Sequence, residues 1–137
     1  MLRRLALVSL FALALAACGE EKDKENAGRA CGAAPTAMSG PPTLLPTAFP
    51  TPEGLVYVSE KKNGPTSIVT GFKPGDLDTN FEAYKDSLST GAFTVTKDEK
   101  DPADAEVNFS GSSTTGQVKL EQECKDRTTV TITARPD

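Results

Sequence analysis

The segment TTVTITA (residues 128–134) decides the fold class, because apolar and polar residues alternate along it. Val130 and Ile132 occupy every second position, and threonines fill the positions beside them. This period of two is typical of a β-strand with one buried face and one face in solvent. The same alternation recurs in three earlier segments, 93–97, 105–110 and 117–123. Together the four segments predict consecutive strands of an antiparallel sheet.

Two further strands are predicted nearer the N-terminus. Residues 55–60 and 66–72 are rich in β-branched and aromatic residues. Asn63-Gly64 lies between them and is a typical two-residue hairpin turn, because both residues tolerate positive φ. These segments therefore predict a β-hairpin at the start of the sheet.

One helix is predicted between the two groups of strands. Asp76 is a candidate N-cap, with Thr79 and Glu82 as an alternative capping box, and Gly91 is a typical residue at a helix end. Between these ends, apolar residues recur at helical spacing, at Leu77, Phe81, Tyr84 and Leu88. The order ββαββββ predicts an α+β fold, an antiparallel sheet of about six strands with one amphipathic helix on one face.

A single helix is too narrow to cover such a sheet. A helix is ~10 Å across and adjacent strands lie ~4.8 Å apart, so one helix covers two or three strands. The proline-rich stretch 42–52 contains three large apolar residues, Leu44, Leu45 and Phe49. We expect this stretch to lie against the sheet and to cover the remaining strands.

The N-terminal sequence MLRRLALVSLFALALAACGE indicates export. Two arginines are followed by an apolar run (residues 5–14), which is shorter than the ~20 residues of a membrane-spanning helix. The leader ends in LAAC (residues 15–18), which resembles the lipobox of bacterial lipoproteins. This resemblance implies that residues 1–17 are a cleaved signal peptide and that Cys18 carries a diacylglyceryl group. Two acyl chains give a stable membrane anchor, whereas one chain binds only marginally.

The resemblance also sets the expected domain organisation. Residues 18–41 are predicted to form a flexible lipid-anchored tether and residues 42–137 a small α+β domain, on the extracytoplasmic face of the cell membrane. Three short motifs, FPTP (49–52), PGDLD (74–78) and GAF (91–93), resemble those of small domains in uncharacterised actinobacterial lipoproteins. This second resemblance implies a fold and no activity.

The three cysteines fit one lipid attachment and one disulfide. If Cys18 carries the lipid, Cys31 and Cys124 remain in an oxidising compartment, where an unpaired exposed thiol rarely persists. A redox-active or metal-binding pair is the alternative, but the two cysteines lack C-x-x-C spacing and the chain contains no histidine. We therefore predict a structural Cys31–Cys124 disulfide.

The composition offers little for catalysis. The absence of histidine excludes Ser/His/Asp and Cys/His nucleophile systems. Asp76 and Asp78 flank the expected helix start, where carboxylates cap exposed N–H groups. The acidic segment 98–104 is interpreted as a solvated hairpin loop. Calcium bound by its aspartates is the alternative, although the glycine and the last glutamate of an EF-hand loop are missing. We expect a non-enzymatic protein without a metal or cofactor.

The exposed face of the predicted sheet is the candidate binding surface. Its polar side chains are Thr94, Thr96, Asn108, Lys119, Glu121, Thr129, Thr131 and Thr133. Rows of threonine give a flat hydrogen-bonding surface, although threonine is also a common strand former. The net charge of −4 becomes more negative when the two leader arginines are removed, which argues against nucleic acid as a partner.

These features predict a non-catalytic, lipid-anchored cell-envelope protein. It contacts the membrane through the lipid on Cys18, and it binds or supports another envelope component, a protein or a glycan. The alternative is an inhibitor or protective factor against a secreted hydrolase, with the acidic segment 98–104 inserted into the active-site cleft of the enzyme.

Overall fold

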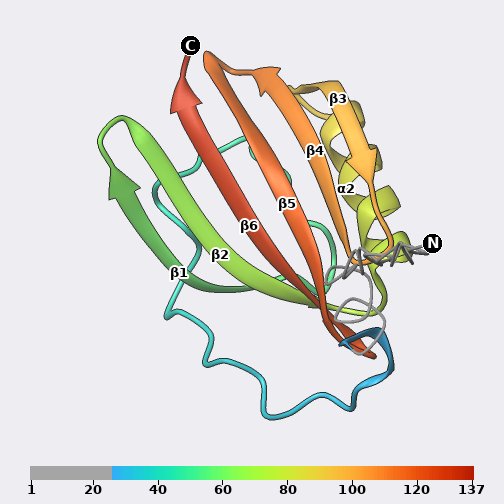
Figure 1. Ribbon diagram of the computed structural model, residues 1–137. Coiled ribbons are helices and arrows are strands. Elements are labelled where there is room, and N and C mark those ends of the chain that lie inside the picture. The colour runs from blue at the N-terminus through green and yellow to red at the C-terminus, as the bar shows by residue number, and fades with distance from the viewer. Residues whose placement is uncertain (1–25) are drawn as a thin grey trace, which may run out of the picture.

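The computed structural model describes residues 26–137, in which one long helix packs behind an antiparallel sheet (Figure 1). After a short helical turn at residues 26–28, the elements are β1 (Val56–Asn63), β2 (Thr66–Pro74), α2 (Leu77–Thr90), β3 (Thr94–Lys100), β4 (Asp104–Gly111), β5 (Thr114–Cys124) and β6 (Arg127–Pro136). The strand order in the sheet is β1-β2-β6-β5-β4-β3. The predicted α+β class, the chain order ββαββββ and the six antiparallel strands are confirmed.

Strand β6 joins the two parts of the sheet. The hairpin β1–β2 and the run β3–β4–β5 are separate in the chain, and β6 pairs with β2 on one side and with β5 on the other. Val130 and Ile132 of β6 are buried in the core, while the threonines that alternate with them are only half-buried. The alternation in residues 128–134 thus defines the two faces of the whole sheet.

Helix α2 covers one half of the buried face, because it packs on β3, β4 and β5 and reaches only the near side of β6. Its start is capped as predicted: the Asp76 carboxylate accepts a hydrogen bond from the Thr79 N–H at 2.9 Å. This bond is the main cause of the lowered pKa of Asp76. The predicted apolar positions are all buried: Leu77, Phe81, Tyr84 and Leu88.

The proline-rich segment (residues 42–52) covers the face beyond the helix. Phe49 is only 8% exposed, and its ring packs against those of Phe93 and Phe109 with centroid distances of 5.4 and 5.1 Å. Leu45 is partly buried against the same core. The proline-rich segment therefore lies against the sheet as predicted, and Phe49 is its main apolar contact.

A carboxylate on the edge strand β1 holds the beginning of this segment. Glu60 accepts hydrogen bonds from the Thr43 N–H at 2.8 Å and from the Leu44 N–H at 2.9 Å. The bond from Leu44 is the largest cause of the lowered pKa of Glu60. The side chain of Leu44 is half-buried and lies outside the core cluster. Leu44 lines a hollow beside Ser67 and Ala134 of the sheet, so its side chain lies at the margin of the buried face and its backbone makes the attachment.

The predicted disulfide between Cys31 and Cys124 is present. It joins the N-terminal part of the described chain to the end of β5. Beside it, the Lys125 N–H donates to the Arg29 carbonyl at 2.8 Å. The disulfide and this hydrogen bond hold the incoming chain at the β5–β6 turn.

The domain begins earlier than the sequence predicts. A flexible tether is expected over residues 18–41, but Arg29 is bound at the β5–β6 turn and the Met38 N–H donates to the Tyr57 carbonyl of β1 at 2.9 Å. A disulfide and backbone hydrogen bonds make these attachments, and neither leaves a periodic pattern in the sequence. The lipidation expected at Cys18 and the signal peptide expected at residues 1–17 both fall outside the described residues.

Strand β3 is longer than predicted and contains a β-bulge after Val95. The bulge shifts the alternation by one residue, so that Asp98 is turned toward α2, where it pairs with Lys85 at 3.1 Å. Only residues 101–103 separate β3 from β4. The segment 98–104 is therefore mostly strand, and it is not the long hairpin loop that insertion into an active site requires.

Candidate functional site

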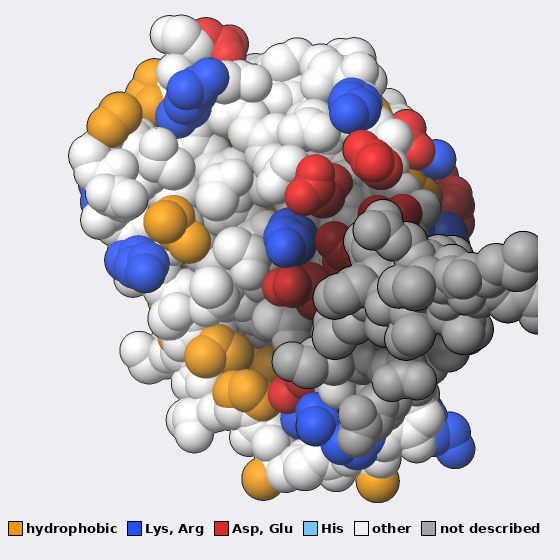
Figure 2. Space-filling view, viewed as in Figure 1, with side chains coloured by type: hydrophobic (Ala, Val, Ile, Leu, Met, Phe, Trp, Pro, Cys, Tyr) orange, Lys and Arg blue, Asp and Glu red, His pale blue; other side chains and the backbone are white. Residues whose placement is uncertain are grey.

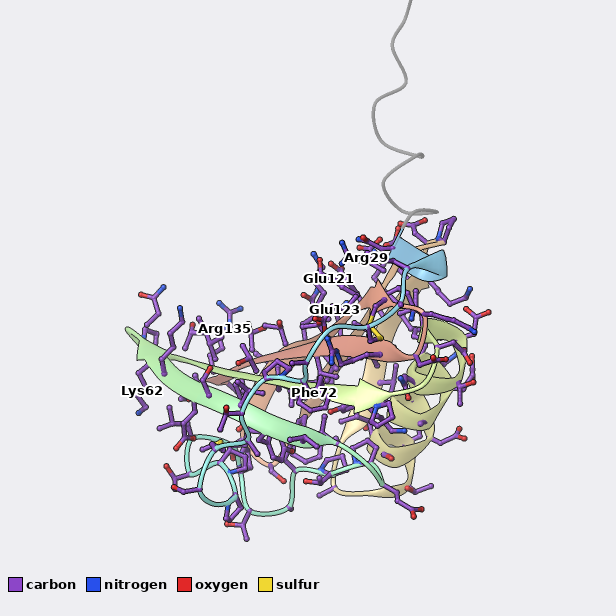
Figure 3. The ribbon with its side chains drawn as sticks, turned by 90° about the horizontal axis from the view of Figure 1, so that it is seen from below. Arg29, Lys62, Phe72, Glu121, Glu123 and Arg135 are labelled. Atoms are coloured by element: carbon purple, nitrogen blue, oxygen red, sulfur yellow. A yellow bond between two sulfur atoms is a disulfide. The ribbon has the colours of Figure 1, made fainter. Side chains whose placement is uncertain are left out.

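One face of the sheet is covered by neither α2 nor the proline-rich segment, and we call it the open face. In Figure 1 it is turned toward the viewer, and Figure 2 shows its surface. Figure 3 shows Glu121, Glu123 and Arg135 on this side of the sheet and α2 on the other. This is the face on which the sequence places the candidate binding surface.

Most of the predicted binding residues form one continuous surface across β4, β5 and β6. They are Asn108, Lys119, Glu121, Thr129, Thr131 and Thr133. Lys119, for example, stands opposite Thr131, and Glu121 stands opposite Thr129. Directly opposed residues of an antiparallel pair share a face, with Cβ atoms ~5 Å apart. The alternation in the sequence thus places these side chains on a common surface.

The two predicted residues of β3 do not both join this surface. Thr94 stands opposite Ser110, at the edge of the open face. Thr96 is the extra residue of the bulge and has no partner on β4, so Lys97 takes the place opposite Asn108. The regular alternation predicted for this strand fails here because a bulge adds a residue to one strand only.

A shallow depression of about 430 Å³ lies on the open face, toward the end of the sheet that holds the C-terminus. The side chains that line it are Thr66, Asn108, Thr115, Gln117, Thr133 and Arg135. Gly116 lies among them at backbone level, and a Cβ added there would point to the core, within 2.7 Å of the buried Phe109 ring. The depression is uncharged apart from its arginine, and its volume lies within the range of ligand sites.

Sequence reasoning found Asn108 and Thr133 but missed the other side chains of the depression. Two of them, Thr115 and Arg135, lie on strand ends that the sequence leaves as loops, since β5 begins at Thr114 and β6 extends to Pro136. Thr115 lies two residues before Gln117 and Arg135 lies two residues after Thr133, so both continue the alternation of their strands. A prediction that continued each alternating pattern by two residues would have included them. Thr66 belongs to β2, and only the register between β2 and β6 brings it to this place.

Charge divides the open face into two halves. The disulfide half, nearer the Cys31–Cys124 bond, carries all the acidic side chains of the face: Glu99, Asp104, Glu106, Glu121 and Glu123. The strands of the C-terminal half carry only basic ones, Lys61, Lys97 and Arg135. Asp137 follows at the rim, beyond the end of β6. Figure 2 shows the acidic side chains gathered right of centre and a mostly uncharged surface at upper left.

Arg127 closes the open face at the disulfide end. Its guanidinium pairs with both carboxylate oxygens of Glu123, at 2.8 and 3.0 Å, and donates to the Gly32 carbonyl at 3.2 Å. It also lies over the ring of Phe72, 5.8 Å from the centroid. Phe72, which stands opposite Thr129, is therefore nearly buried although it belongs to the open face.

The titratable side chains of the described residues do not gather into a metal centre. Within residues 26–137, no group of three histidine, cysteine, aspartate or glutamate residues could hold a metal ion. The calcium alternative fails because Asp98 faces α2 and pairs with Lys85. Two buried polar atoms lack a partner, Asn80 Oδ1 and Tyr84 Oη, and neither residue lines the depression. Burial holds the pKa of the Tyr84 hydroxyl well above its usual range, so it stays protonated in the core.

Comparisons with protein-family models, with curated proteins and with solved structures find no match to this chain. In the part of the chain that the structure describes, no helix is both long and apolar enough to span a membrane. The function proposed below rests on the N-terminal sequence and on the open face.

Proposed function

We propose that this protein is a lipid-anchored, non-catalytic component of a bacterial cell envelope that binds a partner through the open face. The observation that carries the proposal is the contrast between the two faces of the sheet. One is closed by α2 and by the aromatic contacts of Phe49, and the other is polar, half-exposed and hollowed by the depression. The lipobox-like LAAC at residues 15–18 supports the anchor.

The lipid and the depression are expected at opposite ends of the domain. The chain joins the sheet at Cys31, beside the β5–β6 turn, whereas the depression lies toward the far end of β5 and β6. Strand β6 has 10 residues, which span ~30 Å at ~3.3 Å per residue. An anchor at Cys18 therefore leaves the depression on the part of the domain farthest from its attachment.

The composition of the open face favours a protein partner over a glycan. An exposed aromatic ring offers a flat apolar surface with a polar edge, on which a sugar ring stacks. Among residues 26–137, Phe72 is the only aromatic residue on the open face, and Arg127 lies over it. Hydroxyl and amide groups line the depression, and these match the donors and acceptors of a peptide chain.

We expect Thr133→Glu to abolish partner capture. Thr133 lines the depression, so a glutamate there fills it and adds a negative charge. The measurement is quantitative mass spectrometry of proteins captured from detergent-solubilised envelope, with the lipidated protein as bait and the tag placed shortly after Cys18. Thr90→Glu is the matched control, because Thr90 is exposed at the end of α2, behind the sheet. A partner kept by Thr90→Glu and lost with Thr133→Glu supports the proposal, and equal capture by both contradicts it.

We expect Cys18→Ala to prevent lipid attachment and to leave an unprocessed precursor. The thiol of Cys18 is the proposed acceptor of the diacylglyceryl group, and alanine has no nucleophile in its place. Metabolic labelling with an alkyne fatty acid measures the attachment. A Cys31→Ala variant, which retains Cys18, should still be labelled. Normal labelling of Cys18→Ala would rule out the anchor.

A further inference from the structure

We infer that the C-terminal half of the open face binds an acidic peptide segment of a partner protein, with Arg135 pairing with a carboxylate of that segment. This inference rests on the proposed function, because it names the class of ligand that the same surface takes. Three features carry it: the distribution of charge over the open face, the surroundings of Arg135, and the side chains of the depression.

The distribution of charge selects an acidic ligand for this half. Lys61, Lys97 and Arg135 are the charged residues of its strands on the open face, in a chain that has 19 acidic and 15 basic residues overall. Lys97 pairs with Glu99 at 3.3 Å, so Lys61 and Arg135 supply the charge that no ion pair within residues 26–137 neutralises. The acidic side chains of the open face all lie in the disulfide half. An acidic segment is therefore attracted to one half and repelled by the other, and this contrast fixes where it docks.

Arg135 is placed to make the central contact. It is exposed, it lines the depression, and it forms no ion pair with any of residues 26–137. The other arginine of β6 differs, since both carboxylate oxygens of Glu123 already occupy Arg127. A guanidinium presents its N–H groups in a fork that matches a carboxylate, and such charged pairs are stronger than neutral hydrogen bonds.

The side chains of the depression suit an extended peptide. They come from four neighbouring strands, with Asn108 on β4, Thr115 and Gln117 on β5, Thr133 on β6 and Thr66 on β2. Four strands ~4.8 Å apart give a length of ~14 Å, which is about four residues of extended chain. Hydroxyl and carboxamide groups both donate and accept hydrogen bonds, as the peptide group does.

The test is an NMR titration of the ¹⁵N-labelled mature chain, with Cys18 replaced by serine to keep it in solution. The probes are a glutamate–glycine peptide of seven residues, its glutamine and lysine counterparts, and inorganic polyphosphate. We expect the glutamate peptide to shift the amide signals of the depression, with weaker binding at higher salt, and the other two peptides to leave them unchanged. Arg135→Gln should weaken this binding about tenfold, since one charged hydrogen bond is lost. Lys125→Gln, which removes a charge at the β5–β6 turn, should leave it unchanged.

Four results would overturn the inference. They are no shift at about 1 mM glutamate peptide, shifts spread evenly over the surface, equal binding by wild type and Arg135→Gln, and the same shifts from polyphosphate at lower concentration than from the peptide. The last result would identify a general polyanion surface. If partner capture still depends on Thr133 while the glutamate peptide fails to bind, the proposed function stands and only the acidic class of ligand is wrong.

Discussion

Loss of the Cys31–Cys124 disulfide is expected to lower the free energy of unfolding by about 4 kcal/mol. The two cysteines are 93 residues apart, so the bond closes a long loop and removes much of the entropy of the unfolded chain. For a domain of this size, such a loss corresponds to a fall in Tm of about 20 °C. Urea unfolding of the Cys31→Ser/Cys124→Ser double variant, compared with the oxidised wild type, measures the difference.

Two controls separate the disulfide from other effects of the substitution. The reduced wild type should unfold like the double variant, and both of these proteins should keep the circular dichroism of the native sheet below their transitions. The amide of Met38 should exchange its hydrogen faster in the double variant, because the segment that carries it is then attached at one point fewer. A change in stability below about 1 kcal/mol would contradict the assignment of a structural role.

Phe49→Ala is expected to cost about 3 kcal/mol of stability. Phe49 is 8% exposed and its ring contacts two other buried rings, so truncation leaves a cavity between the proline-rich segment and the sheet. The matched control is Leu44→Ala in the same segment. Leu44 is half-buried and lies outside the core cluster, so we expect less than about 1 kcal/mol from its truncation. Equal effects from the two substitutions would show that the proline-rich segment is not held by the phenylalanine.

Much of the fold follows from short-range patterns. Alternation at a period of two located four of the six strands, and the Asn63-Gly64 turn between two β-branched segments located the hairpin of β1 and β2. The helical spacing from Leu77 to Leu88 located α2. The width of one helix required a second cover for the sheet, and the proline-rich segment supplies it. These inferences succeed because burial repeats along the chain with the period of the local structure.

Features that depend on contacts between distant residues were predicted less well. The bulge in β3 has no signature in residues 93–97, and it turns Asp98 from the expected loop to the helix side. The attachment of Arg29 and Met38 uses backbone hydrogen bonds, which any residue can make. Leu44 has the composition of a core residue, but the position of Glu60 makes it an attachment point of the backbone.

In the candidate site, too, features set by one strand were predicted and features set by contacts between strands were not. The row of threonines on β6 was predicted, because one strand suffices to define it. The depression was not, since it requires the register of four strands. Arg135 was missed because the alternation was ended one step too early, at residue 134.

The most direct test of the proposed function is site-specific photo-cross-linking in intact cells. A benzophenone amino acid replaces Thr133 in one strain and Thr90 in another, so that the same probe sits on the open face or behind the sheet. We predict one cross-linked product of defined mass from position 133 and none from position 90. A product from position 90 together with none from position 133 would contradict the claim that the open face is the binding surface.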